Sequence, residues 1–212
     1  MSAATGREAW ETAWQELGVS VPPEVEYEKL IASYAETHRA YHTRQHLEEC
    51  LTQLREAREM CSYPDEVALA LWYHDAIYEP HRSDNETRSA DRLVRVASQI
   101  SVPTAAIGRM RELVLATRHN ATPAGTDAQL LVDIDLSILG TSAQRFDEYE
   151  QQVRKEYRWV PLPIYRSQRA KILESFLRRP RIYSTEHHFN MLESRARENI
   201  TRSLGQLRSR LL

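Results

Sequence analysis

Two short stretches of the sequence place ionisable residues in otherwise apolar surroundings. His74 and Asp75 are consecutive within LALWYHDAIY, and Asp133 and Asp135 lie two positions apart within LLVDIDLSIL. Burying an ionisable group without a partner costs several kcal/mol. Because an imidazole and carboxylates that meet in a protein interior are stabilised most simply by a divalent cation, we expect these residues to bind a metal ion.

His46 is expected to supply a further metal ligand from another helix. It lies on the first turn of a helix predicted to begin with Thr43 as its N-cap, and Cys50 and Leu54 continue the inward face. Two neutral imidazoles and two carboxylates would neutralise one divalent ion. These nitrogen and oxygen donors suit Mn, Ni, Fe, Mg or Zn without distinguishing among them. Four protein ligands would leave positions for water and a substrate oxygen, as in catalytic sites.

The elements that must position these residues are predicted to be helices. The sequence has only 6 glycines and no Asn-Gly pair, whereas sheet-rich folds use such residues in hairpin turns. Apolar residues recur at helical spacing, and no convincing alternating strand is present. We therefore predict one all-α domain over residues 1–212, with roughly ten helices and a long final helix. The predicted helices are 5–18, the segment after Pro23 to Tyr34, 43–61, 64–79, 83–100, 104–119, the run ending at Gly140, 142–158, 163–178 and 184–210.

The composition argues against several classes of protein. The chain has 28 Lys+Arg against 30 Asp+Glu and a pI near 6.5, which argues against binding of a nucleic-acid polymer. No apolar run is long enough to span a membrane, and no secretion signal is recognisable. Cys50 and Cys61 are too few for a disulfide framework, and we expect both as buried thiols on one helix. A cytoplasmic protein that binds no membrane is predicted, and its oligomeric state is left open.

The order of the candidate ligands resembles the HD superfamily of metal-dependent phosphohydrolases. Context strengthens the resemblance, because YHTRQH, LWYHDAIY, DNETRSA, TRHN, VDIDLSILG and VRKEYRWVP, over about residues 34–200, together resemble one bacterial branch. The resemblance implies that His46, His74, Asp75 and Asp135 bind the metal. Asp133 is the alternative to Asp135. Residues two apart on a helix differ by about 200° in direction, so only one of them can face the ion.

Two departures from that superfamily's pattern affect the expected chemistry. Dinuclear relatives carry two further histidines between the dyad and the last aspartate, where this chain offers only His81 and His119. A single metal ion is therefore expected. Some relatives place a catalytic glutamate three residues after the dyad, where this chain has Tyr78. Glu86 and His119 are then the candidates for general acid or base, because both are predicted near helix ends.

The resemblance implies hydrolysis of a small phosphorylated substrate, with nucleotides among the candidates. The metal would bind a phosphate oxygen and lower the pKa of a water molecule that attacks phosphorus in line. Positive side chains should neutralise the remaining phosphate charge. Arg39 and His42 closely precede His46 and are candidates for this role. Arg154 and Arg169 are further candidates, although related proteins often have glycine where Gln168 precedes Arg169.

Several candidate residues also have simpler structural explanations. Glu86 could belong to a helix capping box that starts at Ser83. His119 could be only a favourable cation at a helix C-terminus, and Arg154 and Arg169 could form ordinary surface ion pairs. Trp10, Trp14 and Trp72 are expected in the core, and His187 and His188 are expected to be exposed.

Two alternatives concern the site as a whole. His38, His42 and His46 are spaced four apart and could form a metal-binding face by themselves, although an N-cap at Thr43 would interrupt that helix. The chain could also be a degenerate domain of the HD type that binds a ligand or partner without turnover, or a helical scaffold in which the histidines and aspartates are structural.

Overall fold

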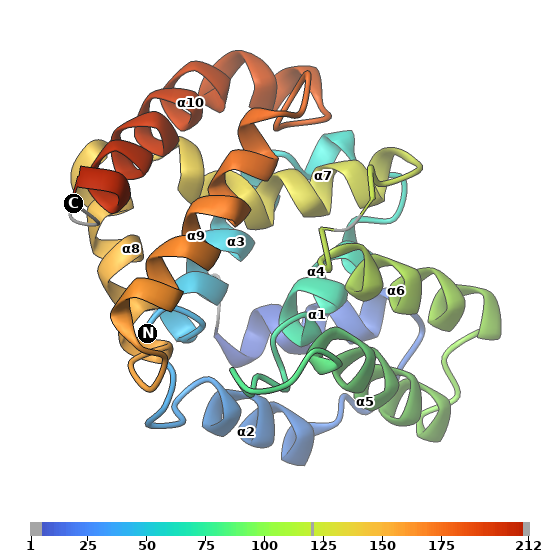
Figure 1. Cartoon of the computed structure of the whole chain (residues 1–212). Helices are drawn as coiled ribbons and strands as arrows, with labels where there is room; N and C mark the ends of the chain where they lie inside the picture. The colour runs from blue at the N-terminus through green and yellow to red at the C-terminus, as the bar shows by residue number, and fades with distance from the viewer. Residues whose placement is uncertain (1–5, 120, 210–212) are drawn as a thin grey trace. The chain divides into compact units, whose positions relative to one another are not determined.

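The computed structural model describes residues 6–119 and 121–209 and contains helices but no strand within those ranges, so the all-α prediction is confirmed. Figure 1 shows the helices in chain order. They are α1 (Arg7–Glu16), α2 (Glu24–Ser33), α3 (Arg44–Glu56), α4 (Pro64–Tyr73), α5 (Asn85–Gln99), α6 (Thr104–Ala116), α7 (Thr126–Asp135), α8 (Ala143–Glu156), α9 (Leu162–Leu177) and α10 (Glu186–Ser209), with the short 3-10 helices η1 (Arg58–Met60) and η2 (Leu136–Gly140).

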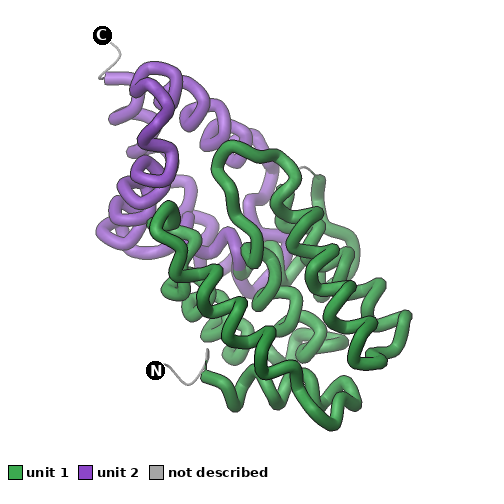
Figure 2. Tube along the Cα trace, turned by 90° about the horizontal axis from the view of Figure 1, so that it is seen from below, with its two compact units in different colours: residues 1–134 green, residues 135–212 purple. Residues whose placement is uncertain are grey.

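The chain divides into two compact units, residues 1–134 and 135–212, which Figure 2 shows in different colours. The division falls between the last two residues of α7, so Asp135 ends a helix that otherwise belongs to the first unit. The prediction of a single domain over residues 1–212 stays a prediction.

The core of the first unit contains a cluster of aromatic side chains. Trp10 packs against Trp14 and Trp72 with ring centroids 5.5 and 5.3 Å apart, and Tyr27 and Tyr73 complete the cluster. All five side chains are buried, which confirms the prediction that these tryptophans are core residues. Offset and edge-to-face aromatic pairs of this kind add to the stabilisation from burial. The cluster thereby anchors α4, which carries Trp72 and leads directly into His74.

Helix α4 ends earlier than the sequence suggested. It is apolar on nearly all sides and is buried, as predicted, but its last residue is Tyr73 and His74 follows as the C-cap. Side chains and turns satisfy the carbonyl groups at this end: the Tyr34 hydroxyl donates to Trp72 O at 3.1 Å, and Ala76 N donates to Tyr73 O at 2.9 Å. His74 and Asp75 therefore lie in the turn after the helix and not inside it.

Helix α3 begins where the sequence predicted and ends sooner. Thr43 is the N-cap residue with an extended backbone, although its hydroxyl makes no capping bond. The helix stops at Glu56 and a 3-10 turn follows, so Cys61 lies outside it. Cys50 is buried and Cys61 is half-exposed. The prediction of two buried thiols on one helix is therefore wrong for Cys61.

The predicted capping of α5 differs from its observed start, and α6 ends earlier than predicted. Helix α5 begins at Asn85 with Asp84 as N-cap and no capping bond from its side chain, so the predicted Ser83–Glu86 capping box does not form. The Asn85 side chain instead accepts from Glu79 N at 3.2 Å and donates to Glu79 O at 3.0 Å, which closes the preceding loop. Helix α6 follows Pro103 and ends at Ala116.

In the second unit, the long helix α10 packs against η2. Gly140 approaches α10 so closely that a Cβ atom added to it would lie 2.6 Å from Leu192 Cβ. Asn199 on α10 donates to Leu139 O and Thr141 O, each at 3.0 Å. His188 is buried and faces Thr185 Oγ1 at 3.1 Å, so the prediction that both neighbouring histidines are exposed is wrong for His188. The register of α10 turns His188 inward and leaves His187 exposed. No helix in the described ranges is long and apolar enough to cross a membrane.

Candidate metal centre

Two buried imidazoles from consecutive helices of the first unit face each other. His46 is the third residue of α3, and His74 is the C-cap of α4. Both residues are 2% exposed, and their Nε2 atoms lie 3.1 Å apart. Because α3 starts at Arg44 and α4 stops at Tyr73, the start of one helix and the end of the other bring the two imidazoles together.

The Asp75 carboxylate completes a triangle of donor atoms with these imidazoles. Its Oδ2 atom lies 3.1 Å from His74 Nε2 and 3.7 Å from His46 Nε2. Two ligand atoms at about 2.1 Å from one ion lie about 3.0 Å apart at a right angle and about 3.4 Å apart at the tetrahedral angle. The three edges of the triangle therefore have the size of the edges of a metal coordination shell.

The surrounding hydrogen bonds indicate where the protons are. His74 Nδ1 lies 2.7 Å from Leu71 O, and a carbonyl oxygen can only accept, so Nδ1 carries the proton. The Nε2 atom of a neutral His74 then turns a lone pair toward Asp75 Oδ2. That oxygen is buried and accepts no hydrogen bond from the described residues. Because a lone pair facing a carboxylate oxygen is repulsive, the arrangement requires either a second proton on His74 or a cation among these atoms.

Charge and orientation at the site also suit a cation. Burial alone would raise the pKa of Asp75, but His74, with His42 and His46, holds it below its ordinary value. The carboxylate is therefore charged at neutral pH. The Tyr41 hydroxyl lies 3.0 Å from His46 Nδ1 and orients that imidazole from behind. Hydrogen bonds to the outer nitrogens of two histidines are typical of metal ligands.

Cys50 is a candidate ligand that the sequence analysis assigned only to the core. It follows His46 by one helical turn, and its buried Sγ atom lies 3.8 Å from His46 Nε2. A thiolate and an imidazole nitrogen bound to the same tetrahedral ion lie about 3.6 Å apart. The spacing of four residues was visible in the sequence. A buried cysteine at helical spacing is usually a packing residue, and only its distance from the imidazole distinguishes it.

Asp135 is the aspartate of the VDID segment whose carboxylate lies near His46, Cys50 and His74. As the last residue of α7, it is positioned by a helix whose other residues belong to the first unit. His46, Cys50, His74 and Asp135 each offer one ligand atom within 4.8 Å of all the others, so this group could hold a metal ion. Asp133 is fully buried on α7 and is not part of the group.

Arg39 was predicted to bind phosphate, and in the structure it forms hydrogen bonds to backbone carbonyl groups. Its side chain is fully buried and donates to Asp75 O at 2.7 Å and to His42 O at 3.2 Å. Its Nε atom also donates to Glu36 at 3.0 Å. The guanidinium thus ties together the two backbone segments that carry candidate residues. Whether it also contacts substrate stays a prediction.

His42 lies beside the site but outside α3. Its imidazole stacks on the Tyr78 ring with centroids 4.0 Å apart, and His38 Nε2 lies 2.7 Å from Tyr78 O. Of the three histidines spaced four apart, only His46 is on the helix. The alternative of a single helical face formed by His38, His42 and His46 is therefore wrong.

The two candidates for general acid or base lie at helix ends. Glu86 is the second residue of α5, is half-buried, and forms no hydrogen bond or ion pair with the described residues. His119 follows α6 and has a φ of 54°, a left-handed conformation that is uncommon outside glycine. His81 is exposed. Their catalytic roles stay predictions.

The remaining candidates, Arg154 and Arg169, belong to the second unit. Arg169 is buried, donates from Nε to Glu150 at 3.0 Å, and lies over the Tyr149 ring. Burial opposes its charge, but Tyr149 and Glu150 raise its pKa overall, so it stays protonated. Arg154 donates to Tyr157 O at 2.7 Å and Val160 O at 3.1 Å. Both arginines therefore have structural partners within their own unit.

The group formed by His46, Cys50, His74 and Asp135 could hold a metal ion. A set of imidazoles and carboxylates suits ions that keep water ligands, whereas a thiolate would favour zinc. Comparisons of the chain with models of protein families, with curated proteins and with solved structures found no match.

Proposed function

We propose that this chain is a metal-dependent phosphohydrolase that cleaves a phosphoester of a small metabolite, with nucleotides among the candidate substrates. The observation that supports this most is the buried triangle of His46 Nε2, His74 Nε2 and Asp75 Oδ2, with edges of 3.1, 3.1 and 3.7 Å. Asp135 would be the fourth ligand. A divalent ion bound there supplies a Lewis acid for a phosphate oxygen and a water molecule of lowered pKa.

The surrounding residues prepare the ligands for this task. The bond from His74 Nδ1 to Leu71 O keeps its Nε2 free of a proton in the neutral form. Tyr41 holds the His46 imidazole in place, and Arg39 fixes the backbone of Asp75. Preorganised ligands lose little freedom on binding, so these contacts should strengthen metal affinity.

Proton transfer to the leaving group and recognition of phosphate would come from other residues. Glu86 or His119 would act as general acid or base. Arg39, His42, Arg154 and Arg169 were predicted to bind the phosphate. We favour His42 for this role, because its imidazole contacts the His46 ring and stacks on Tyr78.

Metal analysis combined with a phosphoester panel tests the proposal. Protein purified without added metal would be analysed by mass spectrometry for Mn, Fe, Ni, Zn and Mg, then assayed for phosphate release with each ion. We expect His74→Ala and Asp75→Asn to lose metal and hydrolysis together. His187→Ala is the control, because His187 is exposed in the second unit and is not in the donor group. Full activity of Asp75→Asn, or no metal in any preparation, would refute the proposal.

The position of Cys50 supports a second candidate function, a closed zinc site in a domain that binds a ligand or partner without turnover. His46, Cys50, His74 and Asp135 would then form a tetrahedral set with no position for substrate. The two candidates differ in one ligand: the open site uses Asp75, and the closed site uses Cys50.

A pair of isosteric variants distinguishes the two sites. In the phosphohydrolase, Cys50→Ser should keep the metal, and Asp75→Asn should lose it. In the closed zinc site, Cys50→Ser should lose the metal, because serine is a poor ligand for zinc. Asp75→Asn should keep the metal, because Asp75 is not one of the four ligands. Zinc content of the two variants, measured after the same dialysis, decides between them.

A further inference from the structure

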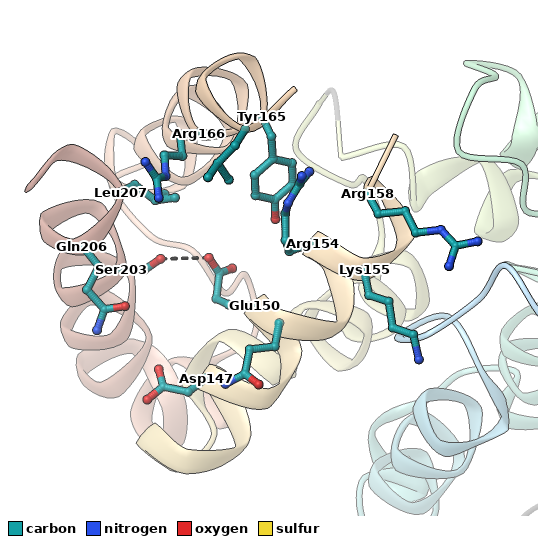
Figure 3. A pocket seen from close by; sticks show the side chains of 12 residues that line it. Asp147, Glu150, Arg154, Lys155, Arg158, Tyr165, Arg166, Ser203, Gln206 and Leu207 are labelled. Carbon is teal, nitrogen blue, oxygen red and sulfur yellow. Dashed lines mark hydrogen bonds between the residues drawn. The ribbon is translucent and has the colours of Figure 1, made fainter. Parts of the chain in front are cut away.

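A cavity in the second unit is lined by several cations and by a hydroxyl that has no hydrogen-bond partner among the described residues. It has a volume of about 640 Å³ and lies among α8, α9 and α10. Figure 3 shows its walls, with Arg154 and Tyr165 side by side and Ser203 and Gln206 on α10. No residue of the metal centre lines this cavity.

The acidic residues that line the cavity are already neutralised. Glu150 accepts hydrogen bonds from the buried Arg169 at 3.0 Å and from the Ser203 hydroxyl at 2.8 Å, the bond that Figure 3 marks. Asp147 binds Arg202 at 2.6 Å. Neither Arg169 nor Arg202 lines the cavity. Because these two carboxylates pair with cations outside the cavity, they do little to neutralise the cations that line it.

Four cationic side chains line the cavity: Arg154, Lys155, Arg158 and Arg166. Among the described residues, Arg154 donates only to carbonyl oxygens, which carry no formal charge and therefore do not neutralise it. Within the described ranges, Lys155 and Arg158 form no ion pair with an acidic residue. Like charges gathered around a concave surface repel one another and attract an anion.

Tyr165 contributes a neutral donor at the same place. The residue is 8% exposed, and its hydroxyl is buried without a hydrogen-bond partner in the described part of the chain. Burial raises the pKa of Tyr165 above its ordinary value, although Arg169 opposes this, so the hydroxyl keeps its proton. An unpaired buried hydroxyl is unfavourable, and an anionic oxygen reaching it would provide the missing acceptor.

From this geometry we infer a second ligand site, a cavity that binds the phosphate group of a small molecule without hydrolysing it. Several cations together with a neutral donor match a group that carries two negative charges and several acceptor oxygens. The apolar side chains of Leu162 and Leu207 line the same cavity and can contact an organic portion. The volume is within the range of small-molecule sites.

Titration calorimetry of the full chain with inorganic pyrophosphate at low ionic strength tests this site. The protein is first dialysed against a chelator, so that binding through a metal ion is removed and failure of the phosphohydrolase proposal does not affect the result. We expect saturable binding that weakens as salt is added, because exposed charges are screened. No saturable binding would overturn the inference.

Two variants and a control locate the binding. Tyr165→Phe removes a hydroxyl that has no partner, so the fold should be retained while affinity falls about tenfold, as for loss of a hydrogen bond to a charged group. Arg158→Gln should weaken binding about threefold. Lys171→Gln removes the same charge from an exposed position of α9 outside the cavity and should have no effect. Equal affinities for all four proteins, or loss of binding in Asp75→Asn, would overturn the inference.

Discussion

Substitution of Arg39 tests whether this residue holds the metal centre together or binds substrate phosphate. Its buried guanidinium donates to Asp75 O at 2.7 Å and to His42 O at 3.2 Å. Arg39→Leu removes Nη1, the donor of both bonds, and each unsatisfied buried acceptor costs about 1–3 kcal/mol. The shorter bond should account for most of the loss. We therefore expect the free energy of unfolding to fall by about 3 kcal/mol.

Arg39→Lys separates the charge of the residue from its hydrogen-bonding geometry. Lysine keeps the positive charge that would attract phosphate, but its single ammonium group cannot replace both the two Nη1 bonds to carbonyl groups and the Nε bond to Glu36. If Arg39 is structural, both variants should lose stability and metal affinity, as measured by urea unfolding and metal titration. Arg111→Leu, an exposed control on α6, should change stability by less than about 0.5 kcal/mol. A fully stable Arg39→Leu that still binds metal would refute the reasoning.

Three further outcomes are expected. Gly140→Ala should lower the free energy of unfolding by about 1–3 kcal/mol, because its Cβ would lie 2.6 Å from Leu192 Cβ and 2.8 Å from Leu192 O. Gly205→Ala, whose Cβ would have nothing within 4 Å, should instead stabilise α10 by about 0.5–1 kcal/mol. Thermal unfolding of the two variants compares these effects. Burial, and to a smaller extent His187, lowers the pKa of His188 from 6.5 to about 4. The unfolded chain therefore binds a proton first, and stability that is complete above pH 6.5 should fall as pH drops toward 4; His188→Gln should flatten that part of a stability curve measured by urea unfolding. Finally, a chelator should lower the melting temperature of metal-loaded protein and leave that of His74→Ala unchanged, since a ligand stabilises only the state that binds it.

Local patterns predicted the helices well where one residue controls the boundary. Proline at the first position of α4 and Ser142 as N-cap of α8, whose side chain accepts from Arg145 N at 3.3 Å, act within a few residues. The end of α4 was not predictable in the same way. Its last carbonyl groups are satisfied by Tyr34 and by a turn, and Arg39 holds the segment that follows. Two of these partners lie more than 30 positions away in the chain.

The same contrast applies to the donor residues. His74, Asp75, Asp133 and Asp135 stood out in the sequence because they interrupt apolar segments, where an unpaired charge would be costly, and His46 stood out because it begins a helix face that continues through Cys50 and Leu54. The sequence did not indicate that Arg39 bonds to the backbone of Asp75 or that Cys50 lies beside His46. A nearby arginine looks like a phosphate ligand, and a cysteine on an apolar helical face looks like a core residue, until the distances to Asp75 O and His46 Nε2 are known.

The sequence alone determined that the chain is helical and that charged donors interrupt two apolar segments, because helical periodicity and the cost of burial act over short stretches. Only the tertiary structure decided which atoms meet. It brought His46 Nε2 and His74 Nε2, 28 residues apart in the chain, to 3.1 Å, placed Cys50 beside them, and gathered the cations of α8 and α9 around one cavity. These arrangements depend on how whole helices pack and where each one ends, which no local pattern contains.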